Sequence, residues 1–220
     1  MARIDLYRNV HKGQRAHLFS LAVELGRADH EDTAKVDALA ARLRAALAGL
    51  RRHAENEERF IHPLLLARAP KVAAMLEQEH RDLEPVLREL EDKLDAVQSA
   101  SGNTFEVGME LYRAWCRMLS AYLGHIDAEE RAGMSALWDT CTDEEIFAVI
   151  RTFAASRTAT EQIHDLTSQA PALSPQERAL LVASAMKGGA PAEPVWASLA
   201  AVLPSHDLAR LRADVGIGVG

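Results

Sequence analysis

Cysteines and long apolar runs are scarce in this 220-residue chain. The two cysteines, Cys116 and Cys141, are too few for a disulfide framework and match no zinc-binding spacing. No apolar run reaches the length of a transmembrane helix, and the first residues lack the apolar core of a signal peptide. We therefore expect a cytoplasmic protein with no membrane as partner.

An excess of basic residues is also missing. The chain has 25 lysines and arginines against 32 aspartates and glutamates, which gives a net charge of −7. A charge of this sign argues against nucleic acid as a main partner. The alternation typical of strands is absent as well, whereas alanine and leucine are abundant. The sequence thus predicts an all-α fold.

Four stretches place apolar residues at alternating steps of three and four, which gives each predicted helix an apolar seam. These helices cover residues 3–26, 33–67, 71–99 and 105–131. Because the connecting segments are short, consecutive helices are expected to pack antiparallel. We predict an up-down-up-down four-helix bundle over residues 1–133. A helical C-terminal extension without a ligand cluster is predicted over residues 134–220.

Polar residues interrupt the apolar seams at similar depth in all four predicted helices. They are His11, His53, Glu57, His80, His125 and Glu129. In the second and fourth helices a histidine and a glutamate are four residues apart, so both side chains leave the same face. Folding the chain at its predicted turns brings all six residues to roughly one layer.

Imidazole and carboxylate together are ligands for iron, manganese or zinc. A single buried histidine is more often a hydrogen-bonded core residue. Each buried carboxylate without a partner, however, would lower the stability of the fold by roughly several kcal/mol, which is the usual cost of burying an unpaired charge. The set of six therefore favours a dinuclear metal site. Four imidazoles and two carboxylates cannot fill two six-coordinate ions, so open positions remain for small ligands.

In these residues the chain resembles the hemerythrin-like family, the HHE cation-binding four-helix bundles. The resemblance covers about residues 3–131 and rests on the ordered pattern H…HxxxE…H…HxxxE, carried by Tyr7–Lys12, His53–Pro63, Glu77–His80 and His125–Glu130. It implies two non-haem iron ions with an oxo or hydroxo bridge. By the same resemblance Glu57 and Glu129 bridge the irons, and the terminal ligands are His11, His53, His80 and His125.

One departure shapes the functional expectation. Oxygen-carrying hemerythrins have a further histidine one turn before His80, where this chain has Leu76. The pattern is closer to bacterial hemerythrin-like proteins implicated in oxygen, peroxide or nitric oxide handling and in iron sensing. We expect a di-iron protein, monomeric or a small homo-oligomer, that binds and redox-processes oxygen, hydrogen peroxide or nitric oxide. Peroxide decomposition and nitric oxide consumption are the candidate enzymatic activities.

Two other functions stay open at this point. The protein could be a non-enzymatic iron or oxygen sensor that signals through its C-terminal helices, or a metal-free helical interaction module. Tyr7 and Tyr122 each lie one turn before a predicted ligand, and Glu77 one turn before His80, so each is a candidate to join the site. His62 precedes a proline near a helix end and is expected at the surface.

Overall fold

The computed structural model describes residues 3–217, and every regular element among them is helical. The chain divides into two compact units. The first, here the bundle unit, comprises Met1–Ile4 and His17–Ile146. The second, here the C-terminal unit, comprises Asp5–Ala16 and Phe147–Gly220. The all-α prediction is confirmed.

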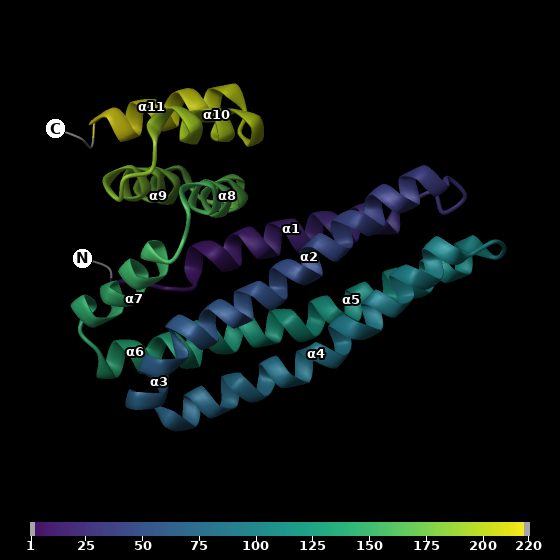
Figure 1. Ribbon diagram of the computed structural model, residues 1–220, viewed down its shortest axis with the longest axis horizontal. Coiled ribbons are helices and arrows are strands. Elements are labelled where there is room, and N and C mark those ends of the chain that lie inside the picture. The colour runs from purple at the N-terminus through teal and green to yellow at the C-terminus, as the bar shows by residue number, and fades with distance from the viewer. Residues whose placement is uncertain (1–2, 218–220) are drawn as a thin grey trace. The chain divides into compact units, whose positions relative to one another are not determined.

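Long helices build the bundle unit, and Figure 1 shows them lying lengthwise beside one another. They are the later part of α1 (Arg8–Gly26), α2 (Thr33–Phe60), α4 (Pro70–Ser99) and α5 (Thr104–Ala128). Shorter segments complete the unit: α3 (His62–Arg68), the π-helical η1 (Glu129–Gly133) and α6 (Met134–Thr140). The helices that the sequence predicts are present and form the expected helical bundle, but the first of them begins at Arg8 and not at residue 3.

The apolar seams meet in one core. Leu21 of α1, Leu43 of α2, Leu90 of α4 and Leu111 of α5 are each at most 1% exposed, and Trp115 is fully buried among them. Each buried leucine stabilises the fold by about 1.5–3 kcal/mol relative to an exposed one. The seams therefore both hold the bundle together and set the rotation of each helix about its axis.

Two of the predicted helices are interrupted. The helix predicted over residues 33–67 breaks at Ile61, and α3 begins at His62 with Pro63 in its first turn. Proline has no backbone N–H to donate, so it is tolerated in a first turn and disrupts a helix interior. The helix predicted over residues 105–131 passes after Ala128 into the π-helical turn of η1. Both interruptions fall within five residues of a predicted metal ligand.

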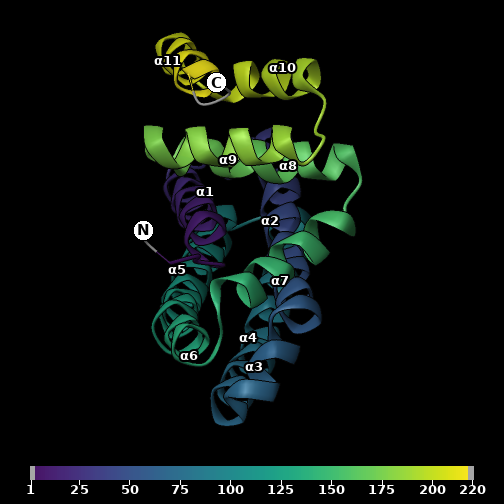
Figure 2. The ribbon, with the colours of Figure 1, turned by 90° about the vertical axis from the view of Figure 1, so that its left-hand side faces the viewer.

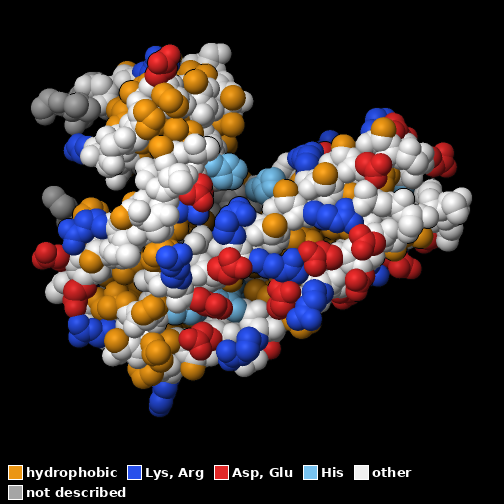
Figure 3. Space-filling view, in the orientation of Figure 1, with side chains coloured by type: hydrophobic (Ala, Val, Ile, Leu, Met, Phe, Trp, Pro, Cys, Tyr) orange, Lys and Arg blue, Asp and Glu red, His pale blue; other side chains and the backbone are white. Residues whose placement is uncertain are grey.

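Ion pairs cover the outside of the bundle, where acidic and basic side chains alternate over the visible face (Figure 3). Arg51 of α2 is the most extensively paired, because its guanidinium donates to Glu84 at 3.0 Å and to Glu91 at 2.6 Å. Both carboxylates belong to α4, so this network ties α2 to α4. Among residues 3–217, no helix combines the length and the apolarity needed to cross a membrane. The cytoplasmic location stays a prediction.

The C-terminal unit has its own small core. Its helices are most of α7 (Asp143–Ala155), then α8 (Ala159–Gln169), α9 (Pro175–Lys187), α10 (Ala192–Val202) and α11 (Ser205–Ile217), and Figure 2 shows α9 beside α8. Val182, Val195 and Leu199 are fully buried between them. Ser174 and Glu177 form a capping box at the start of α9.

The segment Asp5–Ala16 packs within the C-terminal unit. Lys12 Nζ donates to Glu177 Oε2 at 2.7 Å, across 165 residues of sequence. A Cβ added to Gly13 would lie 3.2 Å from the backbone of Gln169, so the start of α1 runs close against the end of α8. The first turns of α1 are thus part of the same compact unit as the C-terminal helices.

Candidate metal centre

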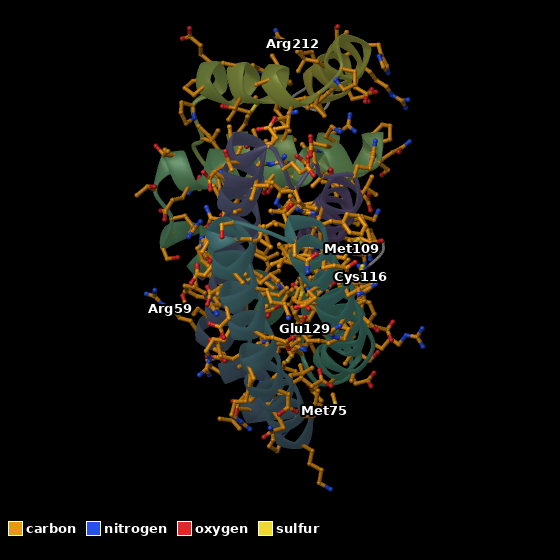
Figure 4. The ribbon with its side chains drawn as sticks, turned by 90° about the vertical axis from the view of Figure 1, so that its right-hand side faces the viewer. Arg59, Met75, Met109, Cys116, Glu129 and Arg212 are labelled. Carbon is orange, nitrogen blue, oxygen red and sulfur yellow. The ribbon has the colours of Figure 1, made fainter. Side chains whose placement is uncertain are left out.

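Five of the six predicted ligands belong to the bundle unit, and the structure brings them together. His53 and Glu57 come from α2, His80 from α4, His125 from α5, and Glu129 from the first position of η1. Glu57 is 2% exposed and Glu129 is fully buried. Figure 4 shows Glu129 in the interior between the helices, whereas Arg59 points away from the bundle. The apolar seams therefore direct these carboxylates inward.

The side chains form two overlapping groups of ligand atoms. In the first, Glu57, His80, His125 and Glu129 offer atoms that all lie within 4.8 Å of one another. In the second, His53 meets the same two glutamates within the same distance. Glu57 and Glu129 are therefore common to both groups.

Individual contacts show how closely the nitrogens approach the carboxylates. His53 Nε2 is 3.0 Å from Glu57 Oε1, and His125 Nε2 is 3.2 Å from Glu129 Oε1, each pair being four residues apart on one helix. His80 Nε2 lies between the two glutamates, 3.4 Å from Glu57 Oε2 and 3.7 Å from Glu129 Oε1. The Nε2 atoms of all three histidines thus face the same pair of carboxylates.

The two buried carboxylates, Glu57 and Glu129, favour positive charge on the groups next to them. Burial lowers the pKa of His80, but the Glu129 and Glu57 carboxylates more than offset it and raise the pKa to about 10. Burial also lowers the pKa of His125, but the carboxylates of Glu129 and, to a smaller extent, Glu79 raise it above its ordinary value. Two buried carboxylates can be neutralised either by protonated imidazoles or by metal cations that bind the neutral rings. The residues present therefore fit a metal centre.

Two further carboxylates hold the outer nitrogens of the imidazoles. His125 Nδ1 is 2.9 Å from Glu79 Oε2, and His80 Nδ1 is 3.2 Å from Glu58 Oε1. Since a carboxylate only accepts, the Nδ1–H donates and Nε2 keeps its lone pair for a metal. Glu58 and Glu79 were not among the predicted site residues. Each is adjacent in sequence to a predicted ligand, Glu57 or His80, and neighbouring positions on a helix point about 100° apart, so sequence spacing gave no signal for them.

His11, the sixth predicted ligand, belongs to the C-terminal unit. Its side chain is fully buried, and its ring stacks on Tyr7 with the centroids 5.3 Å apart. Burial of a histidine at this position agrees with the predicted seam of the first helix. Its role as a terminal ligand stays a prediction.

The structure also separates the secondary candidates. Tyr122 is 3% exposed, with its ring centroid 6.1 Å from that of His125, so it lies beside the ligand layer. Glu77 is half-buried and lies outside both ligand groups. His62 contradicts the expectation of a surface residue, because it is only 3% exposed and stacks on His80. Burial, followed by the neighbouring His80, lowers the pKa of His62.

A helical bundle with a buried layer of imidazoles and carboxylates defines a class of protein, the helical-bundle metalloproteins. A family model described as the hemerythrin HHE cation binding domain matches residues 2–137, which is more than half of the chain. The chain therefore belongs to the hemerythrin HHE cation-binding family. Searches of curated proteins and of solved structures gave no match.

Proposed function

We propose that the protein is a non-haem di-iron protein that binds and redox-processes a small ligand, namely oxygen, hydrogen peroxide or nitric oxide. The observation that carries this proposal is the sharing of Glu57 and Glu129 by two groups of ligand atoms. One group offers His80 and His125, and the other offers His53, to which the resemblance adds His11. Two bridged ions use every one of these side chains, whereas one ion leaves several of them unused.

The donor set favours iron and leaves room for a ligand. Mixed imidazole and carboxylate donors suit iron, and bound iron supplies one-electron redox chemistry. The six side chains cannot saturate two six-coordinate ions. The protein's own contribution is to hold the imidazoles of His80 and His125 in place through Glu58 and Glu79, which contact the Nδ1 atoms.

A small cavity supports a diatomic or peroxide ligand. It offers about 50 Å³ to water-sized molecules and is lined by Leu50, Arg51, His53, Ala54, His80, Leu83, Glu84, Leu87 and Tyr122. One water needs about 10–15 Å³ measured in this way, so the space suits a few atoms and excludes a larger substrate. Its wall contains two predicted ligands, His53 and His80. We propose this cavity as the place from which a small ligand reaches the metal.

The proposal is tested by metal content. Protein expressed in iron-replete medium should hold two iron ions per chain, as measured by elemental analysis and protein quantification. The double variant Glu57→Gln with Glu129→Gln should lose both, because amides cannot replace two bridging carboxylates. Rapid gas evolution on adding hydrogen peroxide to the wild-type holo-protein would support peroxide decomposition. A wild-type protein that holds one ion or none per chain would overturn the di-iron proposal.

The cavity gives a separate prediction. Ala54→Leu adds three carbons at its wall, and alanine and leucine have similar helix propensities. Azide, a small anion that binds ferric centres, should bind at least about tenfold more weakly to this variant, the loss expected for a clash costing ~1.4 kcal/mol. The iron content should not change. Ala54→Ser is the matched control and should bind azide like the wild type. Equal azide affinity in all three proteins would show that the ligand enters elsewhere.

The packing of Asp5–Ala16 favours a second candidate function, the non-enzymatic sensor. This segment carries His11 and belongs to the C-terminal unit, where Lys12 pairs with Glu177. Because His11 is a predicted ligand, metal-dependent order in the unit that contains α8 to α11 is the expected sign of a sensor. Metal-dependent protease resistance of residues 132–220 without peroxide or nitric oxide turnover would support the sensor. Turnover without such resistance would support the enzyme.

A further inference from the structure

His62 occupies an inward position that the helix periodicity does not predict. Along α2, His53 and Glu57 are four residues apart, so an unbroken helix would next turn Ile61 inward. The chain leaves the helix at Ile61, which is only half-buried, and restarts α3 at His62. This break shifts the phase by one residue and buries an imidazole in place of an aliphatic side chain.

The neighbours of His62 are members of the metal centre. Its ring stacks on that of His80, with the centroids 5.4 Å apart and the planes inclined by 11°. His80 belongs to the ligand group with Glu57, His125 and Glu129, whereas His62 itself lies next to His80 and outside both groups. Both ring nitrogens of His62 are buried and have no hydrogen-bond partner among the described residues. Unsatisfied polar groups at such depth are rare in proteins and call for a specific explanation, such as a bound ion.

We infer that His62 is an additional nitrogen ligand of the metal centre, serving the ion that Glu57, His80, His125 and Glu129 hold. The inference rests on the proposed function and adds a ligand that the sequence pattern does not contain. A neutral imidazole is a good ligand for iron, and here it is already dehydrated by the fold. On this inference α4 supplies one imidazole to the ion, from His80, and α3 supplies another, from His62, which stacks beside it.

The substitution His62→Phe separates coordination from packing. Phenylalanine keeps a flat ring for the stack on His80 but removes both nitrogens. If His62 is a ligand, the variant should bind Co(II), used as an optical probe, at least about tenfold more weakly, in the range known for lost metal-site interactions. Pulsed electron paramagnetic resonance of the iron-loaded protein should count one fewer coordinated imidazole. The metal-free variant should be at least as heat-stable as the metal-free wild type, because two unsatisfied nitrogens are gone.

Two matched variants complete the experiment. His206→Phe makes the same change at a side chain that is 83% exposed on α11 and should bind Co(II) like the wild type. His80→Phe removes a ligand of the first group and should lower the affinity further than His62→Phe. Unchanged affinity and an unchanged imidazole count in His62→Phe, with metal bound normally by the wild type, would overturn this inference alone. A wild type that binds no metal would overturn the proposed function.

Discussion

The tautomers of His80 and His125 depend on the carboxylates that accept a hydrogen bond from their Nδ1 atoms. Glu79 accepts from His125 at 2.9 Å, and its side chain is 32% exposed, so it reaches the imidazole from the rim of the site. Glu58, which is 53% exposed, does the same for His80 at 3.2 Å. These contacts choose the tautomer that leaves Nε2 available, and they make the imidazole a better ligand.

Glu79→Gln should therefore weaken metal binding without removing a ligand. Loss of such an outer partner typically lowers metal affinity about 10- to 100-fold. The measurement is a competition titration of Co(II) against a chelator. Glu89→Gln removes the same charge from α4, at an exposed ion pair with Arg117, and should leave the affinity within about twofold. If both variants lose affinity equally, the effect is one of general charge and not of the contact with His125.

Among individual residues, the sequence predicted those that are spaced at helical intervals along an apolar seam. His53 with Glu57, and His125 with Glu129, lie on apolar seams, and the structure brings both pairs together with His80. Glu79 was not predicted, because it is one position from His80 and points about 100° away along an isolated helix. Its partner is His125, which is 46 residues distant, so only the packing of α4 against α5 reveals it.

Two helix irregularities position side chains at the candidate metal centre. The break at Ile61 was indicated in part by Pro63, yet its consequence for His62 depends on which face of α3 packs inward. The π-helical turn Glu129–Gly133 has no comparable signal, since no proline occurs within it. π-helical turns are frequent at functional sites, where they insert a residue and redirect a side chain. Sequence periodicity assumes ideal helices and cannot locate such insertions.

The start of α9 gives a prediction about pH. Lys12 foremost, helped by Ser174 and opposed by burial, lowers the pKa of Glu177 from an ordinary value of 4.5 to about 2. A carboxylate with a lowered pKa stabilises the fold fully above pH 4.5 and loses that contribution as the pH falls toward 2. Hydrogen exchange of the full chain, corrected for intrinsic rates, should show the protection of α9 falling across this interval.

Glu177→Gln should remove this part of the pH dependence, because no ionised form remains to be protonated. Lys12→Met keeps the capping box and removes only the ammonium, so it should retain a smaller dependence at higher pH. The ion pair is partly exposed, and high salt should weaken its contribution. An unchanged profile in Glu177→Gln would show that another carboxylate governs the acid sensitivity of α9.

The molecule as a whole combines two compact units in a way that the sequence order does not indicate. Composition and periodicity predicted a bundle over residues 1–133 and an extension beyond it, and this domain division stays a prediction. The first compact unit ends at Ile146, and Asp5–Ala16 belongs to the C-terminal unit. One contact within this unit, between Lys12 and Glu177, joins two ordinary charged residues far apart in sequence. Local patterns carry no trace of such a pairing.

Metal binding should stabilise the bundle unit, and its effect on the C-terminal unit tests the predicted ligand His11. A ligand at about 100 times its dissociation constant stabilises the native state by about 2.7 kcal/mol. Adding Fe(II) without oxygen should therefore raise hydrogen-exchange protection in α2, α4 and α5. If His11 is a terminal ligand, the protection should extend to α8 and α9, which share a unit with His11.

His11→Ala should abolish the metal-dependent protection of α8 and α9 while metal still protects α2, α4 and α5 through the five remaining ligands. His17→Ala, a control on the same helix, replaces a histidine that lies in neither ligand group and should behave like the wild type. Wild-type protection confined to the bundle unit would contradict a link through His11. Because the readout compares regions within one chain, it separates this link from any overall loss of metal affinity.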